Sequence, residues 1–124
     1  MTGPNMDASA APIALHLDLA AMLERFGGDT AFAVECAELL EAELPAMLES
    51  LHDGVRLESA EQLHRAAHTL KGAMCNFCDH GPTRTAAQVD VLAREGRVHE
   101  AGPLVAVLEQ EIAALLAALR GLRA

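Results

Sequence analysis

The sequence has few aromatic residues: its 124 positions include three phenylalanines but neither tryptophan nor tyrosine. Hydrophobic residues nevertheless make up 52% of the chain, and most of them are alanine and leucine. Strands favour β-branched and aromatic side chains, whereas alanine and leucine are strong helix formers. The composition therefore predicts an all-α protein. A chain of this length can build one core but has no room for a separate catalytic domain beside it.

Basic residues are also scarce. Nine lysines and arginines stand against 18 acidic residues, which leaves a formal charge of −9. Such a surface repels nucleic acid and anionic membranes, so we expect neither as a partner. No run approaches the roughly 18 consecutive apolar residues of a spanning helix, and residues 1–11 lack the basic and apolar regions of a signal peptide. These absences predict a cytoplasmic protein, whose three cysteines are reduced thiols.

Apolar residues recur at helical spacing from Leu15 onward, so residues 1–14 are expected to be a flexible tail and residues 15–124 a helical domain. Capping residues, glycines and prolines delimit the expected helices. The first is a short helix from Leu15 to Phe26. The second is capped by Asp29, kinked at Pro45 and broken at Asp53-Gly54. The third starts at the capping box Ser59/Gln62 and ends by Gly81-Pro82, and two more helices cover 83–95 and 98–122. Short links force successive long helices to run antiparallel. We therefore expect an antiparallel up-down-up-down four-helix bundle with an additional short N-terminal helix.

The third expected helix, from Ser59 onward, carries an unusual solvent-facing flank. On a helical wheel His64, His68, Lys71 and Cys75 share this flank, and Gly72 lies close to it. Glycine inside a helix costs about 0.5–1 kcal/mol relative to alanine, so Gly72 is predicted to leave space for a molecule approaching His68. A neutral imidazole is a good nucleophile at phosphorus, and Lys71 would offset the charge of a phosphoryl group.

The sequence contains no site that could supply this phosphoryl group. It has neither a Gly-rich nucleotide loop nor a carboxylate cluster for Mg²⁺. We therefore expect a phosphoryl carrier without its own ATP site, which depends on a partner for the rest of the active site.

Residues 67–73, Ala-His-Thr-Leu-Lys-Gly-Ala, followed by Asn76-Phe77, resemble the signature of histidine-containing phosphotransfer (HPt) domains. Residues 23–29, 43–45 and 94–96 resemble the helix ends and the kinked helix of the same family. The resemblance implies that His68 is phosphorylated, Lys71 is its charge partner and Gly72 provides clearance. It also implies a helical bundle that passes phosphoryl groups between receiver-domain aspartates in two-component phosphorelays.

The resemblance further implies the partners. These would be response-regulator receiver domains or a hybrid histidine kinase, with Mg²⁺ in the receiver and no cofactor in this chain, which we expect to be a monomer. His64 and Cys75 are candidate partner contacts, although for His64 a plain solvated position is the more common case. Gln88 would reach the site only if its helix face turned that way, and we favour an ordinary exposed position.

Two other functions compete with phosphotransfer. The first is a metal or redox site, because the chain offers a C-x-x-C and two histidines four residues apart. Its side chains would be those of His64, His68, Cys75, Cys78 and His80. On a continuing helix the two cysteines would lie about 60° apart on the wheel, which disfavours convergent sulfurs. The second is a bundle that only binds partners, which would have no reason to keep Lys71 and Gly72 in register with His68.

Overall fold

The computed structural model describes residues 17–123, and within this range every regular element is a helix and no strand occurs. The elements are α2 (Leu19–Arg25), α3 (Thr30–Arg56), α4 (Ala60–Met74), α5 (Pro82–Arg94), α6 (Val98–Arg120) and a 3₁₀ turn at Gly121–Arg123. The all-α prediction is confirmed. The expected tail, residues 1–14, lies outside the described residues.

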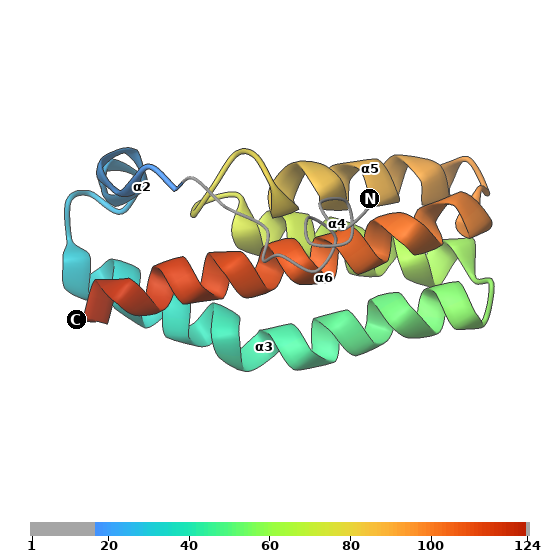
Figure 1. Cartoon of the computed structure of the whole chain (residues 1–124), viewed down its shortest axis with the longest axis horizontal. Coiled ribbons are helices and arrows are strands. Elements are labelled where there is room, and N and C mark those ends of the chain that lie inside the picture. Colours follow the sequence, from blue (N-terminus) through green and yellow to red (C-terminus); the bar gives the residue numbers. More distant parts are fainter. Residues whose placement is uncertain (1–16, 124) are drawn as a thin grey trace, which may run out of the picture.

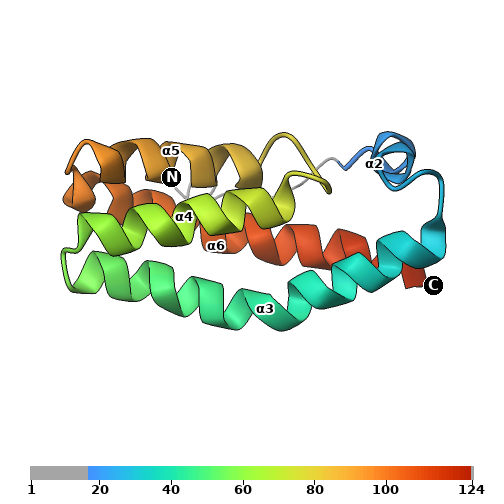
Figure 2. The same ribbon diagram turned by 180° about the vertical axis from the view of Figure 1, so that it is seen from behind.

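The four long helices lie side by side along the long axis of the molecule (Figure 1). Followed along the chain, they run alternately in opposite directions, and the view from behind shows the same arrangement (Figure 2). Helix α4 contacts α3 and α5, and α6 contacts the same two helices from the other side. The short α2 lies at one end, near the start of α3. Helix α4 therefore packs with its two neighbours while its remaining flank is left to solvent.

Leucine, isoleucine, valine and methionine side chains fill the space between the helices. The largest fully buried ones include Leu44 and Leu51 of α3, Leu63, Leu70 and Met74 of α4, Val89 of α5, and Leu108, Ile112 and Leu115 of α6. These are the rows at helical spacing that the sequence predicted as core. Burying each such side chain contributes about 1.5–3 kcal/mol, so the rows fix which face of each helix points outward.

The N-caps confirm one predicted helix start in this part of the chain and correct another. The Asp29 carboxylate accepts from the backbone N–H of Phe32 at 3.0 Å and caps α3, as predicted. Helix α3 also continues through Pro45 as a single helix. The helix expected from Leu15 to Phe26 is described only in part, because Leu15 lies outside the described residues. Within them, α2 starts at Leu19, because Asp18 accepts from the N–H of Ala21 and forms its N-cap.

The predicted break at Asp53-Gly54 is wrong. Helix α3 continues to Arg56, and Gly54 is buried inside it. A Cβ at Gly54 would lie 3.0 Å from the backbone Cα and N of Leu63, which is tighter than nine in ten real Cβ contacts. The glycine is there to let α3 approach α4 closely, not to end the helix. The chain turns later, at Glu58, whose φ is +53°.

Helix α4 begins as predicted but ends earlier. The Ser59 hydroxyl accepts from the N–H of Gln62 at 3.2 Å, which is one half of a capping box. The reciprocal half is absent within the described residues, because the Gln62 amide donates to the Ser50 carbonyl instead and so links α4 to α3. The helix ends at Met74, and Phe77 is buried beyond it rather than on its last turn.

Helix α6 is long and apolar. By length and composition it could cross a membrane, with a mean hydropathy of 1.6 over its most apolar 18 residues, although the sequence contains no uninterrupted apolar run of that length. Glu109 and Glu111 interrupt it, and its buried row, which includes Leu108 and Ile112, packs into the core. Only 28% of that apolar window is buried, so the core row accounts for part of the apolar character of α6. One such helix is weak evidence for a membrane span.

Candidate functional site

His68 lies on the solvent side of α4. Its neighbours Ala67 and Leu70 are fully buried, so the helix turns the His68 side chain outward, where it is 60% exposed. His64, one turn earlier, is 34% exposed, and Lys71 is half-buried. The flank predicted from the helical wheel is therefore present.

Lys71 is the only lysine of the chain. Among the described side chains no ion pair involves its ammonium group, whereas six arginines make one: Arg25, Arg56, Arg65, Arg94, Arg97 and Arg120. Residues three apart on a helix are neighbours on its surface. The charge of Lys71 is thus available to an anion bound near His68.

Gly72 has a different role from Gly54. A Cβ at Gly72 would meet nothing within 4 Å, so the chain itself does not use the space beside it. A shallow hollow lined by Leu39, Gly72, Ala73 and Asn76, among others, adjoins this position, and Leu39 is 62% exposed there. The bare backbone and the exposed leucine form an open, partly apolar surface next to His68, suited to contact with another molecule.

The site contains one residue that sequence reasoning missed. Asp90 of α5 is 3% exposed and faces the histidines of α4. Its Oδ1 accepts a short hydrogen bond from Nδ1 of His64, and its Oδ2 lies 3.1 Å from a guanidinium nitrogen of Arg94. The same Oδ2 is 3.7 Å from Nδ1 of His68. Helix α5 therefore places a buried carboxylate behind the half-buried His64 imidazole and the exposed His68 imidazole.

The sequence held a signal for Asp90. It belongs to the buried row of α5, with Ala86, Val89 and Ala93 at spacings of three and four residues. A carboxylate on the core face of a helix is almost never left without a partner. The sequence alone could not show that its partners are on α4, because that depends on how α4 and α5 pack.

The Asp90 carboxyl is ionised near neutral pH. Its burial raises the pKa, but the hydrogen bond from His64 and the positive charges of Arg94, His64 and His68 together outweigh the burial, and the pKa lies below its usual value. The Arg94 Nε also lies 3.5 Å from Nδ1 of His64. One nitrogen cannot accept a hydrogen there while donating its own to Asp90, so we assign the Nδ1 proton of His64 to the shorter bond with the carboxylate.

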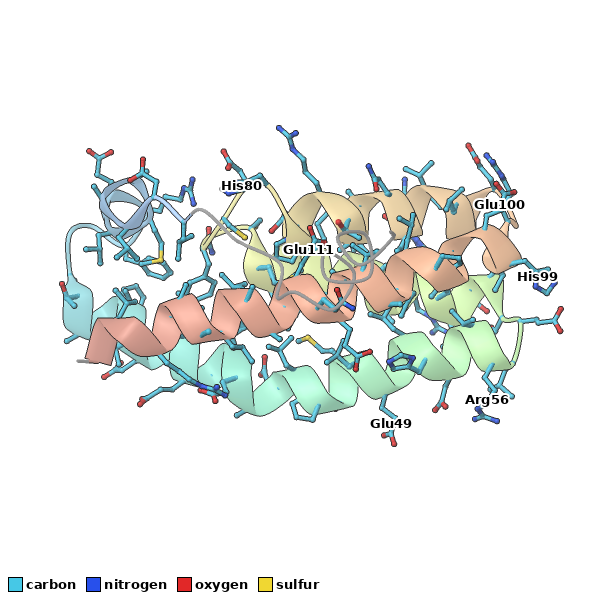
Figure 3. All side chains as sticks on the ribbon, viewed as in Figure 1. Glu49, Arg56, His80, His99, Glu100 and Glu111 are labelled. Carbon is cyan, nitrogen blue, oxygen red and sulfur yellow. The ribbon has the colours of Figure 1, made fainter. Side chains whose placement is uncertain are left out.

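The other candidate residues lie as follows. Cys75 is exposed and its thiol donates to the Gly72 carbonyl at 3.3 Å, whereas Gln88 lies on an outer face of α5 beside Val91 and Leu104. His80 is on the loop between α4 and α5, far along the molecule from His99 (Figure 3). Of the sequence-predicted residues, the structure thus brings together His64 and His68 but gives Gln88 no contact with them in the described range.

The expected continuing helix through the two cysteines is wrong, because Cys75 is the C-cap of α4 and Cys78 follows a turn. Cys78 is buried, and its thiol lies 3.4 Å from the Thr83 hydroxyl. Burial raises the pKa of Cys78, although hydrogen bonds with Thr83 act in the opposite direction. Within residues 17–123 no three His, Cys, Asp or Glu side chains are grouped so that they could hold a metal ion.

The comparison with protein families gives one match, to the Hpt domain, over residues 35–118. Neither a curated protein nor a solved structure matches the chain. The matched range extends from α3 to α6 and includes both histidines and Asp90. Hpt domains take part in histidine phosphotransfer in two-component phosphorelays, where they interact with receiver domains and act as carriers without an ATP site. Because the match covers well over half of its residues, the chain belongs to the Hpt domain family.

Proposed function

We propose that this domain accepts a phosphoryl group on His68 from the aspartyl phosphate of one receiver domain and passes it to the aspartate of another. One observation carries the proposal: an exposed imidazole with a buried carboxylate 3.7 Å behind its Nδ1, flanked by Lys71 and by the open backbone at Gly72.

Asp90 decides which nitrogen of His68 reacts. A negative oxygen facing Nδ1 favours the tautomer that carries its hydrogen there, which leaves the lone pair on Nε2. In the transfer step this lone pair forms the Nε2–P bond while the P–O bond to the receiver's aspartate breaks. The electron pair of the broken bond stays on the aspartate carboxylate. The reverse step with a second receiver returns the Nε2 lone pair.

Lys71 and Gly72 serve the same step from the solvent side. Lys71 remains partly open to solvent, which screens its charge. Its attraction for the added phosphoryl charge therefore contributes about 0.5–1 kcal/mol, which orients the group without driving the transfer. Gly72 keeps the approach to His68 clear. The receiver would supply the Mg²⁺ and the rest of the active site, and this chain would need no cofactor of its own.

We also infer that α3 to α6 form the antiparallel four-helix bundle expected from the sequence, with α2 as the additional helix of a domain spanning residues 15–124. The contacts of α3 and α5 with both α4 and α6 support a closed bundle. The partners would be response-regulator receivers or a hybrid histidine kinase. The charge of −9 argues against nucleic acid and anionic membranes. We propose a cytoplasmic monomer.

The decisive experiment incubates the domain with a phosphorylated receiver and locates an acid-labile, base-stable phosphate by mass spectrometry. His68→Gln should abolish labelling while the circular dichroism spectrum and melting temperature stay unchanged, because exposed substitutions alter stability by under about 0.5 kcal/mol.

His52→Gln is the matched control, since His52 is also exposed and paired with a carboxylate, Glu109 of α6. It should be labelled like the parent. Full labelling of the His68 variant, or a phosphate mapped to His64 or His80, would refute the assignment.

A further inference from the structure

Asp90 is shared unequally between the two histidines of α4. Its Oδ1 takes the hydrogen bond from His64, and its Oδ2 is 3.1 Å from Arg94. The 3.7 Å from this Oδ2 to Nδ1 of His68 exceeds hydrogen-bond length. The ring centroids of the two histidines are only 6.0 Å apart, so a modest rotation of the carboxylate would bring it to His68. The present arrangement is therefore one of two that Asp90 could adopt.

The alternative arrangement would disable the nucleophile. A carboxylate hydrogen-bonded to an imidazole favours the protonated ring, because a charge-assisted hydrogen bond is about twice as strong as a neutral one. A protonated imidazole carries hydrogen on both nitrogens and has no lone pair with which to attack phosphorus. Asp90 must therefore lie near enough to select the tautomer of His68 but not so near that it holds a second proton on the ring.

We propose that His64 is a positioning residue for phosphotransfer: together with Arg94 it holds the Asp90 carboxylate back from His68 and so keeps the His68 ring neutral and nucleophilic. This inference rests on the proposed function, because it takes His68 as the nucleophile. His64 occupies one oxygen of Asp90 and Arg94 occupies the other, so each oxygen already has a partner other than His68.

The charged groups around the pair come from two helices. Helix α4 brings His64 and His68 to Asp90, and α5 brings Arg94. Lys71 stands one turn beyond His68 without an ion pair in residues 17–123. Helix α6, also packed on α5, makes no ion pair with Asp90 in that range and turns Val105 and Leu108 into the core. Asp90 is thus the carboxylate that faces His68 in this arrangement.

The test compares His64→Leu, which removes the hydrogen-bond donor, with His64→Asn, whose amide nitrogen can replace Nδ1 as a donor. Single-turnover transfer from a phosphorylated receiver is measured from pH 5.5 to 8.5 at saturating domain, together with the NMR titration of the His68 ring. In His64→Leu the midpoints of the pH–rate profile and of the His68 NMR titration should both rise by about one pH unit. The transfer rate should then fall about tenfold at pH 6 and by less than about twofold at pH 8.5. The domain concentration for half-saturation should not change.

His64→Asn should behave like the parent at every pH, because a merely structural role would not be rescued by a donor in this position. His52→Leu is the control for loss of a surface histidine and should shift neither titration. Should His64→Leu fail to fold, Arg94→Leu removes the other partner of Asp90 from a side chain that is 56% exposed, and it should shift both titrations in the same direction.

The proposal would be overturned if the pH–rate profile and the His68 NMR titration did not shift in folded His64→Leu. The same holds for folded Arg94→Leu where that variant replaces it. Equal shifts in His64→Leu and His64→Asn would also overturn it. The NMR titration needs no phosphoryl transfer. It therefore still tests whether His64 and Arg94 hold the Asp90 carboxylate away from His68, even if His68→Gln turns out to be labelled. The failures of the two proposals can thus be told apart.

Discussion

Replacing Gly72 by arginine should separate stability from function. Gly72 lies in the last turn of α4, is exposed, and has nothing within 4 Å of the position of a Cβ. Gly72→Arg therefore meets no steric obstacle inside the domain. The new side chain would instead occupy the surface across which a receiver must approach His68.

The magnitude follows from helix propensity alone. Glycine is less favourable than alanine by about 0.8–1.0 kcal/mol in a helix interior, and arginine is close to alanine. With no clash to offset the gain, the variant should be more stable by about 0.5–1 kcal/mol. For a domain of this size that raises the melting temperature by about 2–5 °C.

The assay pairs thermal unfolding with the rate of labelling by a phosphorylated receiver. Labelling should fall at least tenfold, since a docked surface that must exclude water tolerates little displacement. Ala113→Arg is the matched control: it adds the same side chain at an exposed position of α6, the long helix that does not neighbour α4. It should transfer like the parent. Normal labelling of Gly72→Arg would show that this face is not the docking surface, and a lowered melting temperature would show that the glycine serves the fold.

Three further outcomes are expected. Gly54→Ala should lower the urea midpoint by an amount corresponding to about 1–2 kcal/mol, because its Cβ would lie 3.0 Å from the Leu63 backbone and overpacking exceeds the propensity gain; an unchanged or higher midpoint would contradict close packing. The lowered pKa of Asp90 contributes stability that is present above the unfolded pKa of about 4 and is lost as pH falls through the folded pKa. Asp90→Asn should therefore lose less unfolding free energy between pH 5 and pH 2 than the parent. Parallel curves of unfolding free energy against pH for the two proteins would contradict this. Replacing Cys75 and Cys78 by alanine should keep helicity and labelling, with a defect of order 1 kcal/mol from buried Cys78, and a chelator should leave the circular dichroism unchanged; helices that melt on zinc removal would favour the metal site.

The helices could be predicted from the sequence because their signals are local. Asp29 and Ser59 cap helices through atoms three residues away, and the apolar spacing needs no knowledge of the partner helix. Gly54 was misread because the same residue type ends a helix or permits close packing. Only the 3.0 Å approach to Leu63, 9 residues further along the chain, distinguishes the two uses.

The candidate site divides in the same way. His68, Lys71 and Gly72 lie within five residues of one helix, so their common flank follows from 3.6 residues per turn. Asp90 is contributed by the next helix, and its distance from His68 is set by the packing of α4 on α5. A buried carboxylate can be suspected from its place in an apolar row, but its partners depend on how the helices pack.

The burial of Asp90 has a consequence for how the site should respond to change. Asp90 is a buried carboxylate with three cationic or imidazole neighbours. Replacing such a cluster as a whole by apolar side chains is often neutral or stabilising. Removing a single partner is different, because the charge left behind is buried and free to turn toward whichever donor remains. When His64 is removed, the donors left beside Asp90 are Arg94, which already contacts Oδ2, and His68. Substitutions in the cluster should therefore appear first in the protonation of the phosphoryl-accepting ring and only second in the folding of the helices.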